Sequence, residues 1–487
     1  MTIYGNIPVL GSPESATGLS ARDAERMKAL MGVLRANATR NARLETYYAG
    51  RVPWDDVRNA VPTAYKGLDI GCDWGMIAVQ SVAERSQLDG FTFTDPESEA
   101  ARWMGAAFLR DGMALAYQRA LVGMLVHGCV FGTVTKGSRG PRLRWHTARS
   151  ASALWDRENE RPECGMAIVS TRRDQNGHGS HASGIDLYVS EGVWELTYDE
   201  LACGWSAEFL ADPMGRPRMV SMAFRPDDGR PFGHSRFTHG MMSAMREYVA
   251  NALNVHIASD LYAIGQKVLL GVDKKQYEKL VEDKWATAMD AALVLGKNVN
   301  GENPQAYQFQ QQSMEPLLSV KRSLATDFAA SASIPISELL TQDSNPTSAE
   351  ALQASKDRLI SLVEAMNRSN GEALVDAARM MQALGSEKGL GGLTDEQWGV
   401  GVRWRSPSTP SDAAVADFTI KVASAIEGYG QTSVAQERLG FDASERARLQ
   451  GELRRVQARL GATAILDRNR RVSADADDGL RAGALQG

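Results

Sequence analysis

The sequence predicts an α+β protein, and three features lead to this prediction. Runs rich in β-branched and aromatic residues, separated by Gly, Pro and Asp clusters, fill residues 125–224 and indicate antiparallel strands. Two apolar stripes at helical spacing flank a small mixed insert at residues 265–312, which predicts a helical hairpin with a separate head. A longer helical pattern follows residue 350. The 487 residues suffice for about three domain-sized units.

The N-terminal region is expected to hold a loose arm, two helices and the strands. Ser20 and Asp23 begin a helix that extends toward Tyr48, and Pro96 begins the second helix. The expected buried side of the second helix consists of Trp103, Phe108, Met113, Tyr117 and Leu121. The strand-like runs are residues 130–135, 166–171, 185–189, 193–198 and 219–224.

Two helices are expected on either side of the insert, at residues 236–264 and 313–334. The first carries a stripe that begins Met241, Met242 and Met245. Methionines can form an adaptable contact surface, but the spacing is that of a buried face, so packing is the favoured interpretation. Inside the insert, residues 267–272 and 292–295 resemble strands and residues 274–286 resemble a helix.

Residues 344–352, Ser-Asn-Pro-Thr-Ser-Ala-Glu-Ala-Leu, define the start of a long helix. Pro346 disfavours helix before it, and Thr347 and Glu350 stand at capping-box spacing. The apolar face is then drawn by Leu352, Leu359, Val363, Met366, Leu374, Ala378, Met381 and Leu384. Gly385 is expected at the C′ position. Residues 411–463 are Ala-rich and helical, with turns at Gly428 and Gly440.

Charge and cysteine usage exclude some classes of protein. The formal charge is −5, from 54 basic and 59 acidic residues, which argues against a broad grip on nucleic acid. Cys72, Cys129, Cys164 and Cys203 have no zinc-site spacing, so we expect four buried free thiols in a reducing compartment. The longest uncharged run, residues 120–135, is shorter than a membrane span, so no membrane partner is expected.

The sequence lacks the usual catalytic motifs. No P-loop and no Gly-x-Ser-x-Gly elbow occurs, which excludes a P-loop ATPase. His178 and His181 lie close together but lack a third ligand, so a hairpin tip is a simpler interpretation than a metal site. His234 and His239 have no evident nucleophile or carboxylate partner and are expected at the surface or in a cap. No cofactor and no metal is expected.

Residues 344–352 resemble the portal protein of tailed bacteriophages, in the branch found among phages of actinobacteria. In that family, Asn-Pro-Thr-Ser-Ala-Glu-Ala-Leu joins the tunnel loop to the long helix beneath the crown. Residues 43–50, 82–91 and 402–411 resemble further family segments, in the same order, and the resemblance covers roughly residues 20–465. The chain departs from the family at residues 69–74, where Ile-Gly-Cys-Asp-Trp replaces a Val-Val-Asn-Trp type strand.

The resemblance implies a portal fold with a β-rich wing, a long α-helical stem hairpin, a small α/β clip and a helical crown. It divides the chain into the N-terminal arm and wing (1–235), stem helix (236–264), clip (265–312), stem helix (313–334), tunnel loop (335–350), long helix under the crown (351–385), wing return strand (386–410), crown (411–466) and mobile C-terminal tail (467–487).

The same resemblance implies a non-enzymatic role in the virion. The family forms a dodecameric ring at one capsid vertex, after assembly in the host cytoplasm, and its channel carries double-stranded DNA without sequence specificity during packaging and ejection. The implied partners are the terminase large subunit, the head–tail adaptor, and the major capsid and scaffolding proteins.

Two groups of residues are candidate sites. The implied tunnel loop has no cation, and its residues are Thr341, Gln342, Asp343, Ser344, Asn345, Pro346 and Thr347. A loop that faces sliding DNA should bind phosphates weakly, because each neutralised phosphate adds affinity. Without the family, this would be an ordinary helix-connecting loop. In the exposed insert, Lys274, Lys275 and Lys279 are candidate docking residues for terminase or adaptor.

Three alternatives stay open at this point. Lys321 and Arg322 could contact DNA phosphates, although a solvated or ion-paired basic pair is more common. A phage maturation nuclease or protease would need clustered acidic ligands or a nucleophile–base pair, and the sequence offers neither. Another head–tail structural protein, such as an adaptor or capsid subunit, is disfavoured by the long helical hairpin.

Overall fold

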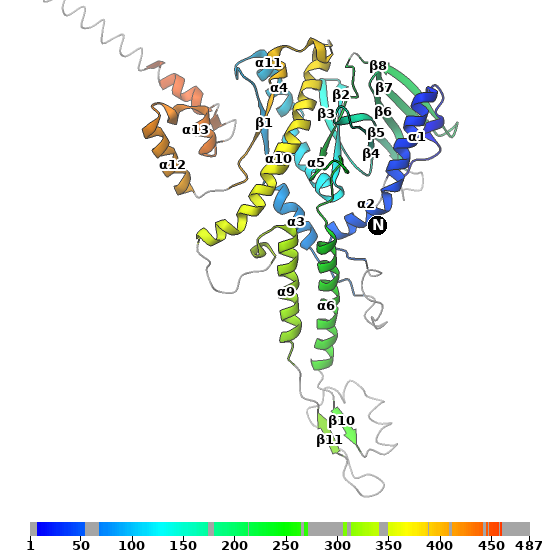
Figure 1. Ribbon diagram of the computed structural model, residues 1–487, viewed down its shortest axis with the longest axis vertical. Coiled ribbons are helices and arrows are strands. Elements are labelled where there is room, and N and C mark those ends of the chain that lie inside the picture. Colours follow the sequence, from blue (N-terminus) through cyan, green and yellow to red (C-terminus); the bar gives the residue numbers. More distant parts are fainter. Residues whose placement is uncertain are drawn as a thin grey trace, which may run out of the picture. The chain divides into compact units, whose positions relative to one another are not determined.

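A computed structural model of the chain describes residues 7–53, 68–173, 180–212, 214–263, 267–270, 305–308, 313–339, 349–387, 389–408, 412–441, 445–446, 448–456 and 458–459. The chain divides into two compact units, Met1–Pro407 and Ser408–Gly487. Helices and sheets both contribute to the first unit, which confirms the α+β class (Figure 1).

Two antiparallel sheets form the β-rich part of the first unit. The larger has the order β4-β5-β6-β7-β8 and the smaller the order β3-β2-β9. Their strands are β2 (Cys129–Gly137), β3 (Gly140–Thr147), β4 (Ala151–Asp156), β5 (Arg161–Arg173), β6 (Ser180–Val189), β7 (Gly192–Asp199), β8 (Gly204–Ala211) and β9 (Met219–Ala223). All five strands predicted from the sequence are confirmed, and β3, β4 and β8 are additional.

The larger sheet is covered on both faces. On one face lies helix α1 (Ala21–Ala36), whose Met27 and Leu30 pack with Ile185 and Leu187 (Figure 1). On the other face, Tyr188 packs in a second cluster with residues of the smaller sheet. The predicted helix start is confirmed, because the Ser20 hydroxyl accepts a hydrogen bond from the Asp23 amide at 3.2 Å.

A helical layer packs against the smaller sheet. It is built from α2 (Ala38–Tyr48), α3 (Trp74–Ala83), α4 (Glu99–Arg110), α5 (Met113–His127) and α10 (Ala349–Ser386). Each of the two helices predicted before residue 128 is in fact a pair. The first breaks at Asn37, and the second breaks at Gly112, whose φ of 58° is left-handed. Met113, Tyr117 and Leu121 are buried as predicted, whereas Trp103 and Phe108 are half-buried.

The prediction that Gly385 ends the long helix is wrong. Gly385 lies inside α10, and the residue with positive φ after the helix is Glu387, at 56°. A Cβ atom at Gly385 would lie 3.1 Å from Trp103 Cζ2, so close packing explains this glycine. The predicted cap at Thr347 and Glu350 lies outside the residues whose side chains the structure describes.

After α10, the chain forms a two-stranded sheet with a segment from the N-terminal part of the first unit. Strand β1 (Leu88–Thr92) pairs antiparallel with β12 (Gly401–Trp404), which follows the short helix α11 (Asp395–Trp398). Arg403 Nε donates to Asp89 Oδ2 at 2.9 Å across this pair. Short 3₁₀ helices lie at Pro13–Ser15, Ile336–Glu338, Leu390–Gly392 and Tyr429–Gln431.

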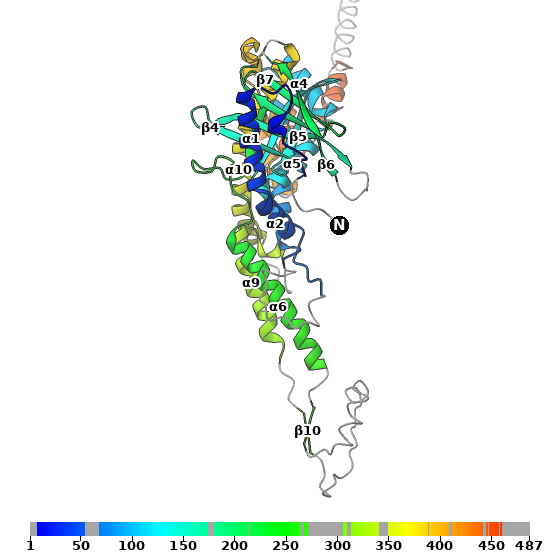
Figure 2. The same cartoon turned by 90° about the vertical axis from the view of Figure 1, so that its right-hand side faces the viewer.

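A helical hairpin projects from the body of the first unit. Helices α6 (His239–Ala263) and α9 (Glu315–Ala332) run side by side in both views, with β10 (Lys267–Leu270) paired to β11 (Gln305–Gln308) beyond them (Figures 1 and 2). Met241 and Met245 are buried in the core that includes Phe328, which confirms the packing interpretation. Strand β11 is not among the strands predicted for the insert. The expected helix 274–286 and strand 292–295 lie outside the described residues.

The second unit contains α12 (Asp412–Ala425) and α13 (Ser433–Arg438). Its predicted turns are confirmed, with φ values of 80° at Gly428 and 90° at Gly440. In the part of this unit that is described, Ala435 is the one buried apolar side chain. The large apolar side chains exposed there are Phe418, Ile420, Ile426, Val434, Leu439, Phe441 and Val456.

The cysteines differ from the expectation at one position. Cys72, Cys129 and Cys164 are buried free thiols, whereas Cys203 is exposed. Burial raises the pKa of Cys72 and of Cys129 to about 12 and that of Cys164 to about 11, so these thiols stay protonated at neutral pH. Among the described helices, none combines the length and hydropathy of a membrane span.

Candidate functional site at the base of the hairpin

The segment between β9 and α6 lies against the end of α5. The Phe224 amide donates to the Gly128 carbonyl at 2.9 Å, and the His234 amide donates to the Phe224 carbonyl at 2.8 Å. The Arg236 amide donates to the Leu125 carbonyl, also at 2.8 Å. These bonds fix the direction in which α6 leaves the body, just before its first residue.

Arg236 ties three elements together at this point. Its Nε donates to the carbonyl of Ala78 in α3 at 2.6 Å, and its Nη2 donates to the carbonyl of Ala332 at 2.7 Å. Ala332 ends α9, and terminal carbonyls of a helix have no partner within it. The residue is 4% exposed, and burial lowers the pKa of its guanidinium to about 10. Arg236 therefore fastens both hairpin helices to the body.

Aromatic and ionic contacts support the same junction. The Trp74 ring lies 4.4 Å from that of Tyr248 in α6 and 5.3 Å from that of Phe328 in α9, measured between centroids. Just after α9, Glu338 accepts from Arg85 Nη2 at 3.1 Å and also bonds the Ser81 hydroxyl. Both hairpin helices thus meet α3 through side chains as well as through Arg236.

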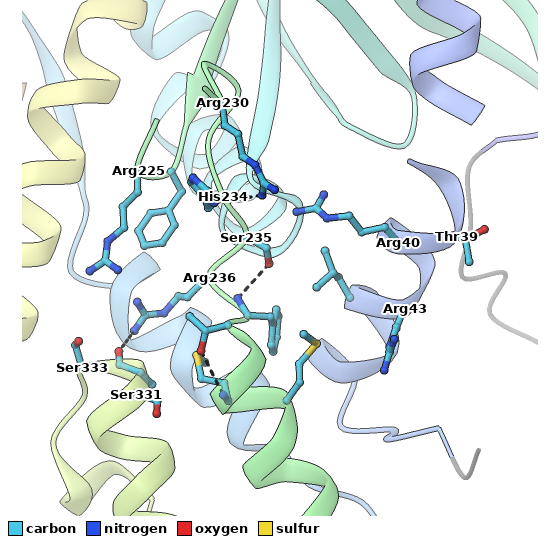
Figure 3. A pocket seen from close by; sticks show the side chains of 17 residues that line it. Thr39, Arg40, Arg43, Arg225, Arg230, His234, Ser235, Arg236, Ser331 and Ser333 are labelled. Carbon is cyan, nitrogen blue, oxygen red and sulfur yellow. Dashed lines mark hydrogen bonds between the residues drawn. The ribbon is translucent and has the colours of Figure 1, made fainter. Parts of the chain in front are cut away.

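A cavity of about 600 Å³ opens beside this junction, between α2, the segment before α6 and the end of α9 (Figure 3). Its 17 lining residues contain no Asp and no Glu. The basic residues among them are Arg40, Arg43, Arg225, Arg230, Arg236 and His234. Arg40 Nη1 donates to the His127 carbonyl at 3.1 Å, which fixes one side of the cavity.

Two known proteins are similar to this chain over most of its length. The portal protein of Mycobacterium phage D29 is 25% identical over 455 residues, which cover 90% of this chain and 89% of that protein. The portal protein of Mycobacterium phage L5 is 25% identical over 420 residues, which cover 84% of this chain and 83% of that protein. Similarity to these two proteins over most of the chain supports a tailed-phage portal protein.

Other comparisons add nothing to this assignment. No family model matches the chain. The neck of a native GTA particle, computed with C12 symmetry, is 16% identical with a TM-score of 0.40 over 75% of this chain and 88% of that chain. The neck of an empty GTA particle, computed with C6 symmetry, is 15% identical with a TM-score of 0.43 over 82% and 98%. Both TM-scores are below 0.5, so the identification rests on the two phage relatives.

As a portal protein, the chain is a structural head–tail connector and not an enzyme. His234 Nε2 lies 2.7 Å from Asp227 Oδ2, so it does have a carboxylate partner, contrary to the sequence reading. Arg230 Nη1 lies 3.5 Å from the other ring nitrogen, His234 Nδ1. No cluster of metal ligands occurs in the described part of the chain. His181 is buried 3.8 Å from Glu200 Oε1, and His178 lies outside the described residues.

The residues that the sequence analysis named as portal sites are not placed by the structure. Thr341 through Thr347 and Lys274, Lys275 and Lys279 all lie outside the described residues. The basic pair in α9 is described. Lys321 Nζ lies 5.5 Å from the Tyr248 ring centroid, and Arg322 Nη1 lies 3.8 Å from Glu315 Oε1, as expected for an ion-paired surface.

Proposed function

We propose that the chain forms a closed dodecameric ring at one capsid vertex, and that its channel carries double-stranded DNA into and later out of the capsid. The observation that carries this proposal is similarity to two phage portal proteins over 84–90% of the chain. A ring of this kind needs a heterologous interface, in which two different patches of neighbouring subunits meet. The described surface has apolar side chains available for such contacts, including Leu318 and Val320 on α9.

The parts of the proposed portal follow the order of the elements. Residues 1–235 are the arm and wing, 236–264 and 313–334 the stem, and 265–312 the clip. The tunnel loop is 335–350, the long helix 351–385, the wing return strand 386–410, the crown 411–466 and the tail 467–487. Support comes from the α6–α9 hairpin with β10–β11 beyond it and from the β1–β12 pairing.

Assembly is the first test of this proposal. The purified full chain should form rings with a central hole in electron micrographs, and native mass spectrometry should give their stoichiometry. The protein should show no ATPase or nuclease activity. A stable monomer at micromolar concentration, with no larger species, would contradict the proposal.

The tunnel loop tests the path of the DNA. Replacing Asp343 and Asn345 with Lys should leave ring assembly intact but slow packaging, because cations in a confined site bind phosphates with little screening. The measurement is packaging rate and packaged length with the cognate motor. Unchanged packaging by rings that carry both lysines would mean that the loop does not face DNA.

The clip tests the docking of partners. Charge reversal at Lys274, Lys275 and Lys279 should weaken binding of the terminase or the adaptor and spare ring formation. Pull-downs with the cognate terminase and adaptor measure this directly. If these variants bind normally and substitutions within residues 1–235 abolish binding, the docking surface lies in the wing.

A further inference from the structure

The cavity at the base of the hairpin, called here the arginine cavity, concentrates positive charge and has no acidic side chain in its lining. Arg236 forms its buried floor, and Arg40, Arg225 and Arg230 are exposed around it. None of its 17 lining residues is acidic, although the whole chain has more acids than bases, 59 against 54. Two acids lie just outside the lining, since Asp227 bonds His234 and the charge of Glu338 acts on Arg236.

Two arginines of this cavity face each other. In Figure 3, Arg40 from α2 and Arg230 from the segment before α6 point toward the same space. Burial is the main cause that lowers the pKa of Arg40 and of Arg236. The charge of Arg230 lowers the pKa of Arg40 further, and the charge of Arg225 does the same for Arg236. Like charges at short range disfavour each other, and the repulsion is relieved when an anion lies between them. The hydroxyls of Ser331 and Ser333 lie on the same lining and can donate to an oxyanion.

We propose that the arginine cavity binds a carboxylate from the stem of the neighbouring subunit. This inference rests on the ring proposed above. In a cyclic ring, a given residue lies at the same height along the ring axis in every subunit. If the stem lies roughly along that axis, an acid that reaches the cavity of the next subunit must lie near the height of the cavity in its own stem. Asp327 precedes the lining residue Ser331 by about 6 Å of helix, and Glu247 follows Met242 by about 8 Å, at 1.5 Å per residue.

Asp327 and Glu247 are exposed, and they lie away from the buried faces of α9 and α6. Within the described part of the chain, neither has a basic partner. The inferred contact would pair acids on the exposed faces of the stem helices of one subunit with arginines at the base of the stem of the next subunit. Arg guanidinium groups bind carboxylates with two parallel hydrogen bonds, which would also fix the register of the subunits.

A carboxylate fits this site better than a DNA phosphate. The site is a cavity with a buried floor, whereas the phosphates of a double helix lie on a stiff convex surface. Several arginines on phosphates would also hold DNA strongly at low salt, which opposes sliding through a channel. A short acidic side chain on a helix can enter the cavity, because the contact between neighbouring subunits positions that helix.

Charge reversal on both sides tests the inference. Arg225 and Arg230 are suitable targets, because neither side chain bonds a main-chain carbonyl in the described residues. The double variant Arg225→Glu/Arg230→Glu, and separately Glu247→Arg/Asp327→Arg, should each raise the concentration needed for ring assembly by about tenfold or more. Combining all four changes should restore assembly. The matched control, Arg35→Glu/Arg157→Glu, has the same change in charge outside the cavity and should assemble normally.

Sedimentation velocity on the full chain measures assembly, and circular dichroism confirms that each variant is folded. If the wild-type chain forms rings and the cavity variants assemble equally well, the inference is wrong and the proposed function stands. If the wild-type chain forms no rings, both are wrong. If the variants assemble normally but their rings lose binding to a labelled DNA duplex, the cavity binds phosphate and the inferred carboxylate is wrong.

Discussion

The proposed wing (residues 1–235) and the proposed stem (helices α6 and α9) differ in how much of their apolar surface one subunit can cover. The five-stranded sheet is buried on one face by α1 and on the other by the smaller sheet. The stem instead buries one stripe, with Met245 and Phe328 inside, and leaves Leu318 41% and Val320 45% exposed. The centre of the wing sheet therefore has a core within one chain, although β8 at its edge leaves Phe209 39% and Leu210 40% exposed. The stem has a buried inner face and an outer face with exposed apolar side chains.

This difference separates residues that hold the subunit together from residues available to neighbours. The base of the stem belongs to the first group, because Arg236, Trp74 and Phe328 lock it to the body. The outer stem belongs to the second group. The second unit resembles the outer stem, since Ile420 is 68% exposed and its described part buries only Ala435 among apolar side chains. Closure of a ring would cover such faces, since a subunit alone leaves them in water.

The largest expected effect is at Phe328, where the stem meets the body. Phe328→Ala should lower the free energy of unfolding by about 3–5 kcal/mol, because a fully buried aromatic side chain leaves a cavity. Urea unfolding followed by tryptophan fluorescence measures this, and Trp74 reports from the contact itself. A loss below about 1 kcal/mol would mean that the stem base contributes little to the folded subunit, and the comparison with the wing would fail.

Arg236 should have the next largest effect. Arg236→Met removes the donors to Ala78 and Ala332, and we expect a loss of about 2–4 kcal/mol because two buried carbonyls stay unpaired. Hydrogen exchange should then increase at the ends of α6 and α9 that face the body. Arg225→Gln, which removes a neighbouring exposed arginine, should change stability by less than about 0.5 kcal/mol. Equal effects of the two substitutions would show that Arg236 is not a fastening residue.

The outer stem should respond in the opposite way. Leu318→Ser/Val320→Ser should alter the stability of the subunit by less than about 1 kcal/mol, because both residues are already almost half exposed. Ring assembly should nevertheless weaken, as measured by sedimentation velocity. Met245→Ala is the matched change on the inner face, and it should destabilise the subunit itself. Loss of subunit stability in the outer variant would remove the distinction between the two faces.

Sequence patterns predicted the long elements well. The helices α6, α9 and α10 follow from apolar spacing, and the five strongest strands follow from β-branched runs. Strand β4, Ala-Ser-Ala-Leu-Trp-Asp, and the mostly exposed β8 were missed, because small and polar residues hide the strand pattern. The local pattern predicts a helix end at Gly385, because its packing against Trp103 cannot be inferred from local sequence.

The site at the stem base was not predictable in the same way. Arg236 lies between His234 and His239 in the sequence, but its partners are 158 and 96 residues away, in α3 and at the end of α9. The partnership of His234 with Asp227 was also missed, although only seven residues separate them, because it depends on a turn in which Asp227 accepts from the Arg230 amide. Local pattern predicts elements, and such contacts arise only when the elements meet.

The smallest expected effect concerns Asp186, a carboxyl group in the sheet of the wing. Burial raises the pKa of Asp186 to about 6, with a smaller contribution from the charge of Glu195 and in spite of the hydrogen bond that Tyr188 donates at 3.0 Å. A carboxyl whose pKa is higher in the folded state takes up its proton before the unfolded chain does. Its ionised form therefore costs stability near neutral pH, and this cost disappears as the pH falls through about 6 toward 4.

Asp186→Asn removes the charge and keeps an acceptor for Tyr188. The variant should melt at a higher temperature than the wild type near pH 7.5, and the two melting temperatures should converge near pH 5. His146 acts with the opposite sign, since burial lowers its pKa to about 4, but both proteins contain it and its contribution cancels in the difference. A difference in melting temperature that stays constant across this range would show that Asp186 does not titrate there. Folding of the wing would then not shift the titration of Asp186 in this range, and its carboxylate would make no contribution to stability that depends on pH.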